Sequence, residues 1–505
     1  MTSRIAECRR YSPDAFEALE GLEEQDSKNL LLKAAEVPLE SWSTYDDQAK
    51  EVVSLLGSHT LALIQAGAYV SQGHCQLYQY PKVYQRQRQR LLEYRPKQAQ
   101  SRYCDVYATF EASSDVLEQS QSESASDALH LLEILSMLGP NVLPLQIFEE
   151  AWKGCKNVLQ HSTNKASAID EFSRDHVLQL PSFIDPEEDE WDRFRLTEAS
   201  SLLASLSLAT RYDLDGGMAL SMHPLTHAWA KDRQNTKRQG AVWIATGCVL
   251  GFSHLNTRFW QIQERRLLPH ILSYLEIKAR RAFGLVSKAV VTPIFLECGW
   301  ALLDMRQDTR LGQLIQDTFL ELGQKPDEPS EDFLPLHDLQ ARSLINLGQV
   351  VQAVALLEQV VQIRKTTLPE MHPDRLASQH ALAGAYRENG QVKEAVALLE
   401  QVVQIRKTTL PETHPDRLAS QHTLAGAYRA NGQVKEAVAL LEQVVQIEKM
   451  TLPETHPSRL ASQHTLAGAY QANRQVKEAV ALLEQVVRIR KATLPETPVP
   501  ARIAA

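Results

Sequence analysis

Apolar residues recur with helical spacing in the last third of the chain, and the pattern itself repeats. The segment Leu-Ala-Ser-Gln-His begins at Leu376, again at Leu418 and again at Leu460, which gives a strict period of 42 residues. A period of this length is typical of helical-repeat architectures. The first two full units differ at only five positions, so we interpret them as recent duplications within the chain.

An earlier unit in the same register begins at Leu334. Aligning residues 348–350 (Gly-Gln-Val) with residues 390–392 places Leu334 opposite Leu376. This unit keeps the apolar pattern of residues 353–364 but has lost most of the pattern that precedes it. The repeated region is therefore predicted to start near residue 334.

Each unit is predicted to form two helices. In the first helix Leu376, Leu382 and Tyr386 share a face, and the Asn-Gly pair at 389–390 ends the helix. In the second, an apolar stripe runs from 392 to 405 and is broken by Leu-Pro and His-Pro pairs. Two such helices cannot bury both faces alone, so neighbouring pairs are expected to stack into a solenoid.

The first 240 residues predict more helices and a short hairpin. Asp26 and Ser27 are predicted to cap the first helix. Further helices are predicted at residues 49–56, 64–70, 129–138, 143–152 and 196–204. The acidic residues 183–192 predict a loop, residues 206–210 and 220–225 two strands, and residues 215–217 the turn between them. Helices around a two-stranded wing predict a winged-helix-like unit, and its lack of a basic recognition helix argues against DNA binding.

The repeat units resemble the tetratricopeptide repeat, in particular the longer version found in kinesin light chains. The His-Pro-Asp at His372 and His414, with His-Pro-Ser at His456, is similar to the light-chain hallmark. The resemblance covers about residues 334–495 and implies that Ala383 and Ala395 lie where two helices approach closely. The residues that fall on the consensus positions are Leu382, Ala383, Tyr386, Gly390, Ala395 and Leu399.

This resemblance implies that the exposed inner face of the first helices binds a protein or peptide ligand. Three columns of polar residues are expected on that face. They are Gln379, Gln421 and Gln463; His380, His422 and His464; and Arg387, Arg429 and Gln471. The alternative is that these are solvated residues copied along with the repeat. Metal binding by the histidines is not expected, because they are 42 residues apart and have no carboxylate or thiol companions.

Four motifs in the first 270 residues resemble, in their order, the nucleotide-binding and helical module of the NOD-like receptors, or NB-ARC proteins, above all fungal members with tetratricopeptide repeats. Residues 56–63 are similar to the family's base-binding segment, and residues 222–225 (Met-His-Pro-Leu) to its Met-His-Asp motif. Residues 2–4 are similar to the end of its sensor strand, and residues 267–270 to the segment that joins the module to the repeats.

The resemblance implies five nucleotide-contacting residues, with His223 contacting the β-phosphate of ADP and Arg4 reporting the γ-phosphate. They are Arg4, Thr60, Leu61, His223 and Pro224. For His223 the alternative is a histidine packed under its neighbours in the winged helix, and for Arg4 a plain surface arginine. His223 and His227 have a spacing that can bind zinc, but no Glu follows His223, so zinc is not expected.

The sequence departs from the NB-ARC family in ways that limit the nucleotide binding and hydrolysis that can be expected. A Gly-x-x-x-x-Gly-Lys-Ser/Thr loop and an apolar strand ending in Asp-Asp are absent from the sequence, and both would lie upstream of Met1. Thr60 stands where the family has proline. Without the phosphate loop most of the binding energy for a triphosphate is missing, so we expect no ATP hydrolysis and at most weak ADP binding.

The composition of the chain excludes further classes of partner and function. The chain of 505 residues has 53 Lys+Arg against 62 Asp+Glu, a net charge of −9, which argues against nucleic acid as a partner. Its six cysteines are scattered, and no apolar run reaches the ~20 residues of a membrane span. With no signal peptide, a cytoplasmic location and no membrane partner are expected. No motif of an enzyme is found, and the acidic run at 185–190 is interpreted as a solvated loop.

The sequence thus predicts a mainly α protein: the helical domain and winged helix of an NB-ARC module, followed by an α-solenoid of tetratricopeptide repeats. The predicted parts are 1–80, a remnant of the nucleotide-binding domain with the following helical domain; 81–240, the winged-helix-like domain; 241–330, a helical connector or degenerate repeats; 334–495, the repeats; and 496–505, a disordered tail.

The sequence is compatible with two functions, and self-association is compatible with both. The first is a signalling protein of NOD-like receptor type, and the second a plain repeat scaffold or adaptor without nucleotide function. A phosphate loop encoded in frame upstream of Met1 would favour the first. A true kinesin light chain is disfavoured, because residues 1–330 show no sustained heptad pattern.

Overall fold

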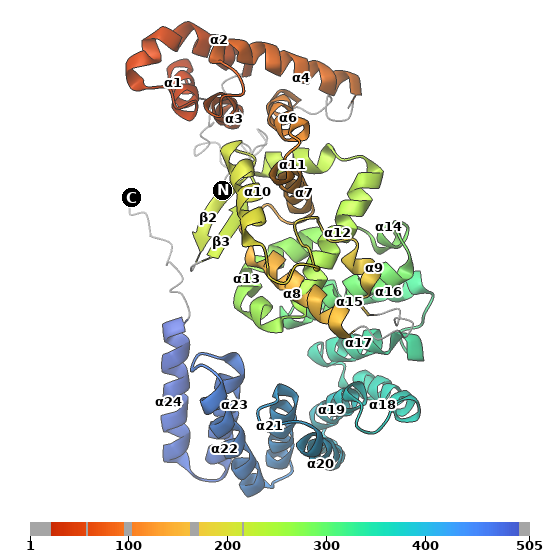
Figure 1. Ribbon diagram of the computed structural model, residues 1–505. Coiled ribbons are helices and arrows are strands. Elements are labelled where there is room, and N and C mark those ends of the chain that lie inside the picture. Colours follow the sequence, from red (N-terminus) through yellow and green to blue (C-terminus); the bar gives the residue numbers. More distant parts are fainter. Residues whose placement is uncertain (1–21, 57–58, 95–103, 162–170, 215–216, 494–505) are drawn as a thin grey trace, which may run out of the picture. The chain divides into compact units, whose positions relative to one another are not determined.

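The computed structural model describes residues 22–56, 59–94, 104–161, 171–214 and 217–493, and these are mainly helical (Figure 1). The chain divides into two compact units, with the division at residues 301 and 302, inside helix α15. The predicted limits at residues 80 and 240 lie within the first unit. The predicted sensor residues 2–4 and tail 496–505 lie outside the described residues.

The first unit contains short and medium helices and one small sheet. Its helices up to the sheet are α1 (Glu24–Ala34), α2 (Asp46–Leu56), α3 (Thr60–Ser71), α4 (Tyr80–Tyr94), α6 (Cys104–Gln119), α7 (Glu123–Met137), α8 (Gln146–His161), α9 (Arg174–Val177) and α10 (Arg193–Ser205), with 3₁₀ turns η3 (Leu39–Tyr45) and η4 (Leu77–Gln79). The strands are β1 (Leu143–Pro144), β2 (Thr210–Leu214) and β3 (Gly217–Ser221). The later helices are α11 (Pro224–Asp232), α12 (Thr236–His254), α13 (Thr257–Tyr274), α14 (Ala279–Phe283) and α15 (Lys288–Asp304).

The predicted wing is present, but its first strand was placed too early and its second too late, since β3 ends at Ser221 and Pro224 already begins α11. Leu206 caps the C-terminus of α10, and Ser207 adopts a left-handed conformation with φ of 53°. Leu208 is then buried, so pairing begins only where Thr210 faces Ser221. The sequence analysis also missed β1, which pairs with β3 and completes an antiparallel sheet of order β1-β3-β2. A two-residue strand has no alternation that a pattern could show.

Helices of the first unit begin earlier than predicted. For the first helix the sequence analysis took Asp26 and Ser27 as the cap. In α1, Asp26 is already in the first turn, and the Ser27 side chain is buried and donates to the Leu22 carbonyl at 3.4 Å. In α7 the cap is Ser122, whose hydroxyl accepts from the Ala125 amide at 3.2 Å, seven residues before the predicted start at residue 129.

The core of the first unit depends on a close crossing of α8 and α12. A Cβ at Gly154 would meet the Phe252 carbonyl, so a larger residue there would force the two helices apart. Phe148 of α8 packs edge-on against Phe183, and both rings are almost completely buried. Among the described residues, no helix is both long and apolar enough to cross a membrane.

The second unit is a series of helix pairs, as the 42-residue period predicted. It contains α16 (Asp308–Leu322), the turn η5 (Glu331–Phe333), α17 (Leu334–Asn346), α18 (Val350–Thr367), α19 (Pro373–Glu388), α20 (Val392–Thr409), α21 (Pro415–Ala430), α22 (Val434–Thr451), α23 (Pro457–Ala472) and α24 (Val476–Thr493). From α17 onward each helix packs against the next, so the predicted earlier unit, α17 with α18, is confirmed. Ala383 and Ala395 are fully buried, which agrees with the close approach expected there.

Candidate protein-binding surface of the repeats

The first helix of each full repeat starts in the same way. His372, His414 and His456 are the N-cap residues, and each ring Nδ1 accepts from the backbone amide two residues later at 3.2–3.3 Å. A proline occupies the first helical position in each case, where its missing N–H costs nothing. The His-Pro pair is therefore a start signal that fixes the register of the helices α19, α21 and α23.

The predicted exposure of the glutamine column is wrong. Gln379, Gln421 and Gln463 are buried, with 6, 4 and 0 % of their surface exposed. The spacing explains this, because Gln379 lies three residues after Leu376 and four before Ala383, on the apolar stripe. These side chains therefore lie inside the solenoid, where a ligand on its surface does not reach them.

The histidine column joins neighbouring repeats. The half-buried His380 ring lies 3.4 Å from both the Ser420 and the Thr423 hydroxyl of the following repeat. His422 contacts Ser462 at 3.1 Å and Thr465 at 3.3 Å in the same way. Burial lowers the pKa of His380 to about 4, assisted by nearby arginines, and burial also lowers the pKa of His422. These two rings are neutral inter-repeat contacts at neutral pH, whereas His464 is exposed.

The arginine column is accessible to different degrees, with Arg387 half-buried and Arg429 exposed. Arg387 lies seven residues after His380 on the same helix face, and its guanidinium extends towards Gly426 of the next first helix, 3.0 Å from where a Cβ would be. Arg429 lies over Gly468 in the same way. Arg387 pairs with Glu388 at 2.7 Å. In the next repeat Ala430 stands at the position of Glu388, so Arg429 has no acidic neighbour at that place.

Gln471 takes the arginine position in the last full repeat and is exposed. The arginine column therefore has two members within the full repeats, one repeat apart, and each lies beside a glycine. Glycine at these positions leaves room for the guanidinium, because a Cβ there would crowd an arginine nitrogen. This combination of two cations on a surface of small residues is the feature of the predicted site best suited to contact a ligand.

Buried charges at the joints between repeats were missed by the sequence analysis. Arg364 pairs with Asp338 at 2.6 Å, and Arg406, one repeat later, donates to the Asp416 carbonyl at 2.8 Å and to the Ser420 hydroxyl. Glu448 occupies the same position in the next repeat and is 3 % exposed. The pairs Arg406/Glu448 and Asp416/Ser458 are two of the five positions at which the first two full repeat units differ. Only the structure shows that the two positions face each other.

The predicted nucleotide residues belong to two helices of the first unit. Thr60 is exposed at the first position of α3, and the half-buried Leu61 follows it. His223 caps α11, with Pro224 in the first turn, and its Nδ1 accepts from the Leu225 amide at 3.1 Å. His223 is exposed, so the alternative of a packed histidine is wrong. Both α3 and α11 pack against α6, while Arg4 lies outside the described residues.

The two histidines of the zinc alternative both contact the backbone. The Nε2 of His227 contacts the Leu138 carbonyl at 2.5 Å, and burial lowers the pKa of the ring. In the part of the chain that the structure describes, no three His, Cys, Asp or Glu residues are grouped to hold a metal ion. His270, from the predicted joining segment, lies inside α13 beside the Val142 carbonyl, and burial lowers its pKa to about 4.

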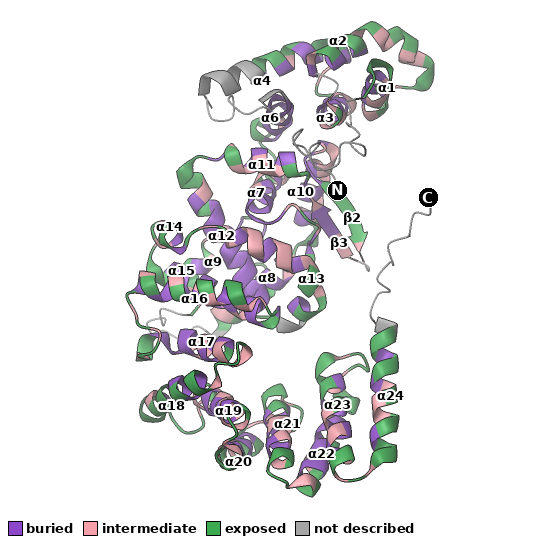
Figure 2. Ribbon diagram, turned by 180° about the vertical axis from the view of Figure 1, so that it is seen from behind, coloured by how far each residue is buried: buried purple, intermediate pink, exposed green. Residues whose placement is uncertain are grey.

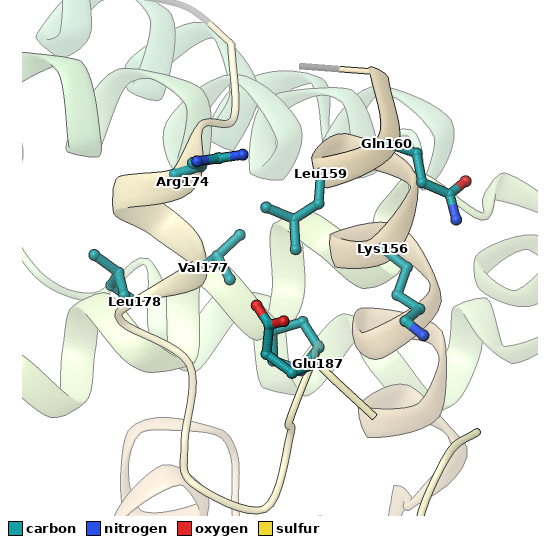
Figure 3. A pocket seen from close by; sticks show the side chains of 8 residues that line it. Lys156, Leu159, Gln160, Arg174, Val177, Leu178 and Glu187 are labelled. Carbon is teal, nitrogen blue, oxygen red and sulfur yellow. The ribbon is translucent and has the colours of Figure 1, made fainter. Parts of the chain in front are cut away.

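A hollow of about 460 Å³ lies in the first unit, away from every predicted site residue (Figure 3). One wall is α8, with Lys156, Leu159 and Gln160, and the other is α9, with Arg174. Glu187 approaches from the loop between α9 and α10. The Lys156 ammonium donates to the Glu188 carbonyl and lies 4.8 Å from the centre of the Trp152 ring, so it anchors the loop.

The stacked helix pairs and their surface columns define a helical-repeat protein. Residues 416–492 match a family model of the tetratricopeptide repeat, and residues 341–374 and 375–416 match a second model of the same description. Residues 341–492 are therefore tetratricopeptide repeats. No curated protein matches the chain.

Several solved structures are similar to parts of the chain. Two contain the nearly identical repeats of a putative kinesin light chain from Podosopora anserina. The first, a variant with one glutamine replaced by methionine, is 52 % identical over 39 % of this chain and 94 % of that chain, with a TM-score of 0.34; the second is 48 % identical over 43 % and 99 %, with a TM-score of 0.33. A signal transduction ATPase with numerous domains from Pyrococcus horikoshii, with a tetratricopeptide repeat sensor, is 10 % identical over 94 % of this chain and 67 % of that chain, with a TM-score of 0.32.

Proposed function

We propose that the repeats bind an acidic segment of a protein partner on the surface that carries Arg387 and Arg429. The observation that supports this most is the placing of the two guanidiniums beside Gly426 and Gly468, on the surface of neighbouring first helices. Guanidinium groups bind carboxylates through paired, charge-assisted hydrogen bonds, and two of them one repeat apart favour an extended ligand with spaced carboxylates.

Peptide display tests this proposal. Random dodecapeptides are selected on the whole protein and on the Arg387→Ala/Arg429→Ala variant, with Lys393→Ala/Lys435→Ala as a charge-matched control on exposed positions of the second helices. The wild type and the control should enrich peptides rich in Asp and Glu, and the arginine variant should bind them roughly tenfold or more weakly. Equal binding by the arginine variant contradicts the proposal.

We further propose that the chain is a signalling protein of the NOD-like receptor type, with at most weak ADP binding and no enzymatic activity. The support is the exposed His223 at the start of α11, whose Nδ1 accepts from a backbone amide and so leaves the proton of the neutral ring on Nε2. An Nε2–H group is a donor, as contact with a phosphate oxygen requires. The shared neighbour α6 links this helix to the one that carries Thr60.

Calorimetry with ADP on the purified protein tests the nucleotide part. His223→Asn keeps a good helix cap and removes the imidazole, so loss of binding in this variant cannot be assigned to loss of the cap. Binding that is lost in His223→Asn supports the receptor type. No heat of binding in the wild type leaves the alternative, a repeat scaffold or adaptor without nucleotide function, whose peptide binding through Arg387 and Arg429 would be unchanged.

A further inference from the structure

The last helix, α24, carries an apolar face that its sequence equivalents bury. Val480 and Val487 are 47 and 48 % exposed, whereas Val438 and Val445, at the same positions of α22, are 7 and 3 % exposed. Among the described residues no helix follows α24 to cover this face, and Figure 2 shows α24 largely exposed. The face is therefore a copy of an internal interface.

The preceding joints show what this interface is built to receive. At the joint after α20, the side chains of Val396, Leu399 and Val403 pack with Leu424 and Ala427 of α21, and Tyr428 lies at the edge of the cluster. The joint after α22 has the same composition, with Leu466 and Ala469 of α23. The covering helix thus places Leu, Ala and Tyr at positions i, i+3 and i+4.

Polar contacts at the edge of these joints add specificity. The Tyr428 hydroxyl donates to Glu400 at 2.8 Å, and the Tyr470 hydroxyl donates to Glu442 at 2.8 Å. Glu484 stands at the corresponding position of α24. The α24 face therefore keeps both parts of the recognition pattern, the valine stripe and the carboxylate that accepts from a tyrosine.

A second copy of this chain does not supply the matching helix. The helices α19, α21 and α23 are each covered by the preceding helix of their own chain. The remaining first helix, α17, has Gln340 at the leucine position and Leu344 at the tyrosine position. A polar amide would replace the central leucine, and no hydroxyl would reach Glu484.

We propose that the exposed face of α24 docks a helix of another protein that carries Leu, Ala and Tyr in this register, so that the solenoid continues into a partner chain. This surface is separate from Arg387 and Arg429, and the proposal stands whether or not those residues bind an acidic segment. The partner helix is recognised by a dry apolar stripe and one tyrosine hydroxyl, the chemistry of the chain's own joints.

The probe for this site is a labelled peptide of residues 413–432 of this chain, helix-stabilised by a lactam between positions 426 and 430, which lie off the docking face. Fluorescence anisotropy measures its binding to the whole protein. Val487→Asp and Val480→Asp change residues that are exposed in the free protein, so folding should persist, and a circular dichroism melt verifies this. Ala481→Asp is the matched control, because Ala481 and its equivalents Ala397 and Ala439 are exposed in every repeat.

We expect saturable binding that each valine variant weakens roughly tenfold or more and that the control changes less than about twofold. A peptide with Leu424→Asp should not bind, and one with Tyr428→Phe should bind more weakly. No binding, or binding that the valine variants leave unchanged, overturns the proposal. Sedimentation that shows a dimer of the whole protein, lost in Val487→Asp, also overturns it, because the occupant would then be a second copy.

Discussion

At the scale of single residues, Glu448 is the clearest departure of a repeat from its own pattern. It replaces the buried arginine of the two preceding joints, and Ser458 replaces the aspartate that Arg406 approaches at 3.9 Å. A glutamate facing an aspartate would repel it, and the change to Ser458 removes that repulsion. Burial nevertheless raises the pKa of Glu448 to about 7, although Ser462 and Arg459 oppose the shift.

This pKa predicts a pH-dependent joint between α22 and α23. The folded protein holds the Glu448 proton more tightly than the unfolded chain, in which the glutamate pKa is near its ordinary value of about 4.5. The protonated carboxyl therefore stabilises the folded protein fully below pH 4.5, and this stabilisation is lost as the pH rises through 7. Glu448→Gln cannot ionise. Its melting temperature should be close to that of the wild type at pH 5 and higher at pH 8, and the excess in unfolding free energy should grow by on the order of 2 kcal/mol between these pH values.

The groups facing Glu448 are Arg459, Ser462 and, through Ser462, the ring of His422. Burial lowers the pKa of His422, and this ring is the same in the wild type and in Glu448→Gln. Comparing the two proteins at each pH cancels titrations elsewhere in the chain. A difference in melting temperature that is the same at pH 5 and pH 8 would contradict the assignment to Glu448.

Gln463 gives a second prediction about a single residue. Its side chain is fully buried, and neither amide atom has a hydrogen-bond partner among the described residues. Gln463→Leu keeps the volume and removes two unsatisfied polar atoms, so it should raise the unfolding free energy by about 1–2 kcal/mol, measured by denaturant titration. Binding of acidic peptides should not change. Weaker peptide binding would restore Gln463 to the ligand surface that the sequence analysis assigned to it.

At the scale of the helices, the absence of a side chain at Gly426 and Gly468 allows Arg387 and Arg429 to occupy their positions. Alanine at Gly468 has a higher helix propensity, and its Cβ meets only the flexible end of Arg429. Gly468→Ala should therefore keep or raise stability while displacing the Arg429 guanidinium, and acidic peptides should bind several-fold more weakly. Gly384→Ala, where a Cβ meets nothing within 4 Å, is the control and should leave binding unchanged. Equal binding by both variants would remove Arg429 from the site.

The helices of the repeats were predictable because one apolar stripe and one stop signal recur in register. The side on which a polar residue lies was harder to predict. Gln379 shares the stripe with Leu376 and is buried, although glutamine is usually exposed. In the first unit the helix α7 and the wing were predicted, but the strand β1 and the cap Ser122 were not. The strand depends on tertiary pairing with β3, and the cap depends on a local side-chain hydrogen bond.

At the scale of the whole molecule, the second unit is a linear array in which each helix contacts only near neighbours. Stability in such an array is a sum of repeat and interface terms, so a helix with one neighbour opens more readily than a helix with two. The helix α24 packs on α23 and leaves Val480 and Val487 exposed, whereas α20 and α22 are covered on both sides.

Hydrogen exchange of the whole protein should therefore show protection that falls from α20 through α22 to α24. Adding the peptide of residues 413–432 should slow exchange in α24 and leave α20 unchanged, because the peptide supplies the missing neighbour. In Val487→Asp the protection gradient should remain while the effect of the peptide disappears. Exchange in α24 as slow as in α20 without peptide would mean that the face is already covered, and the array would then lack the open end on which this prediction depends.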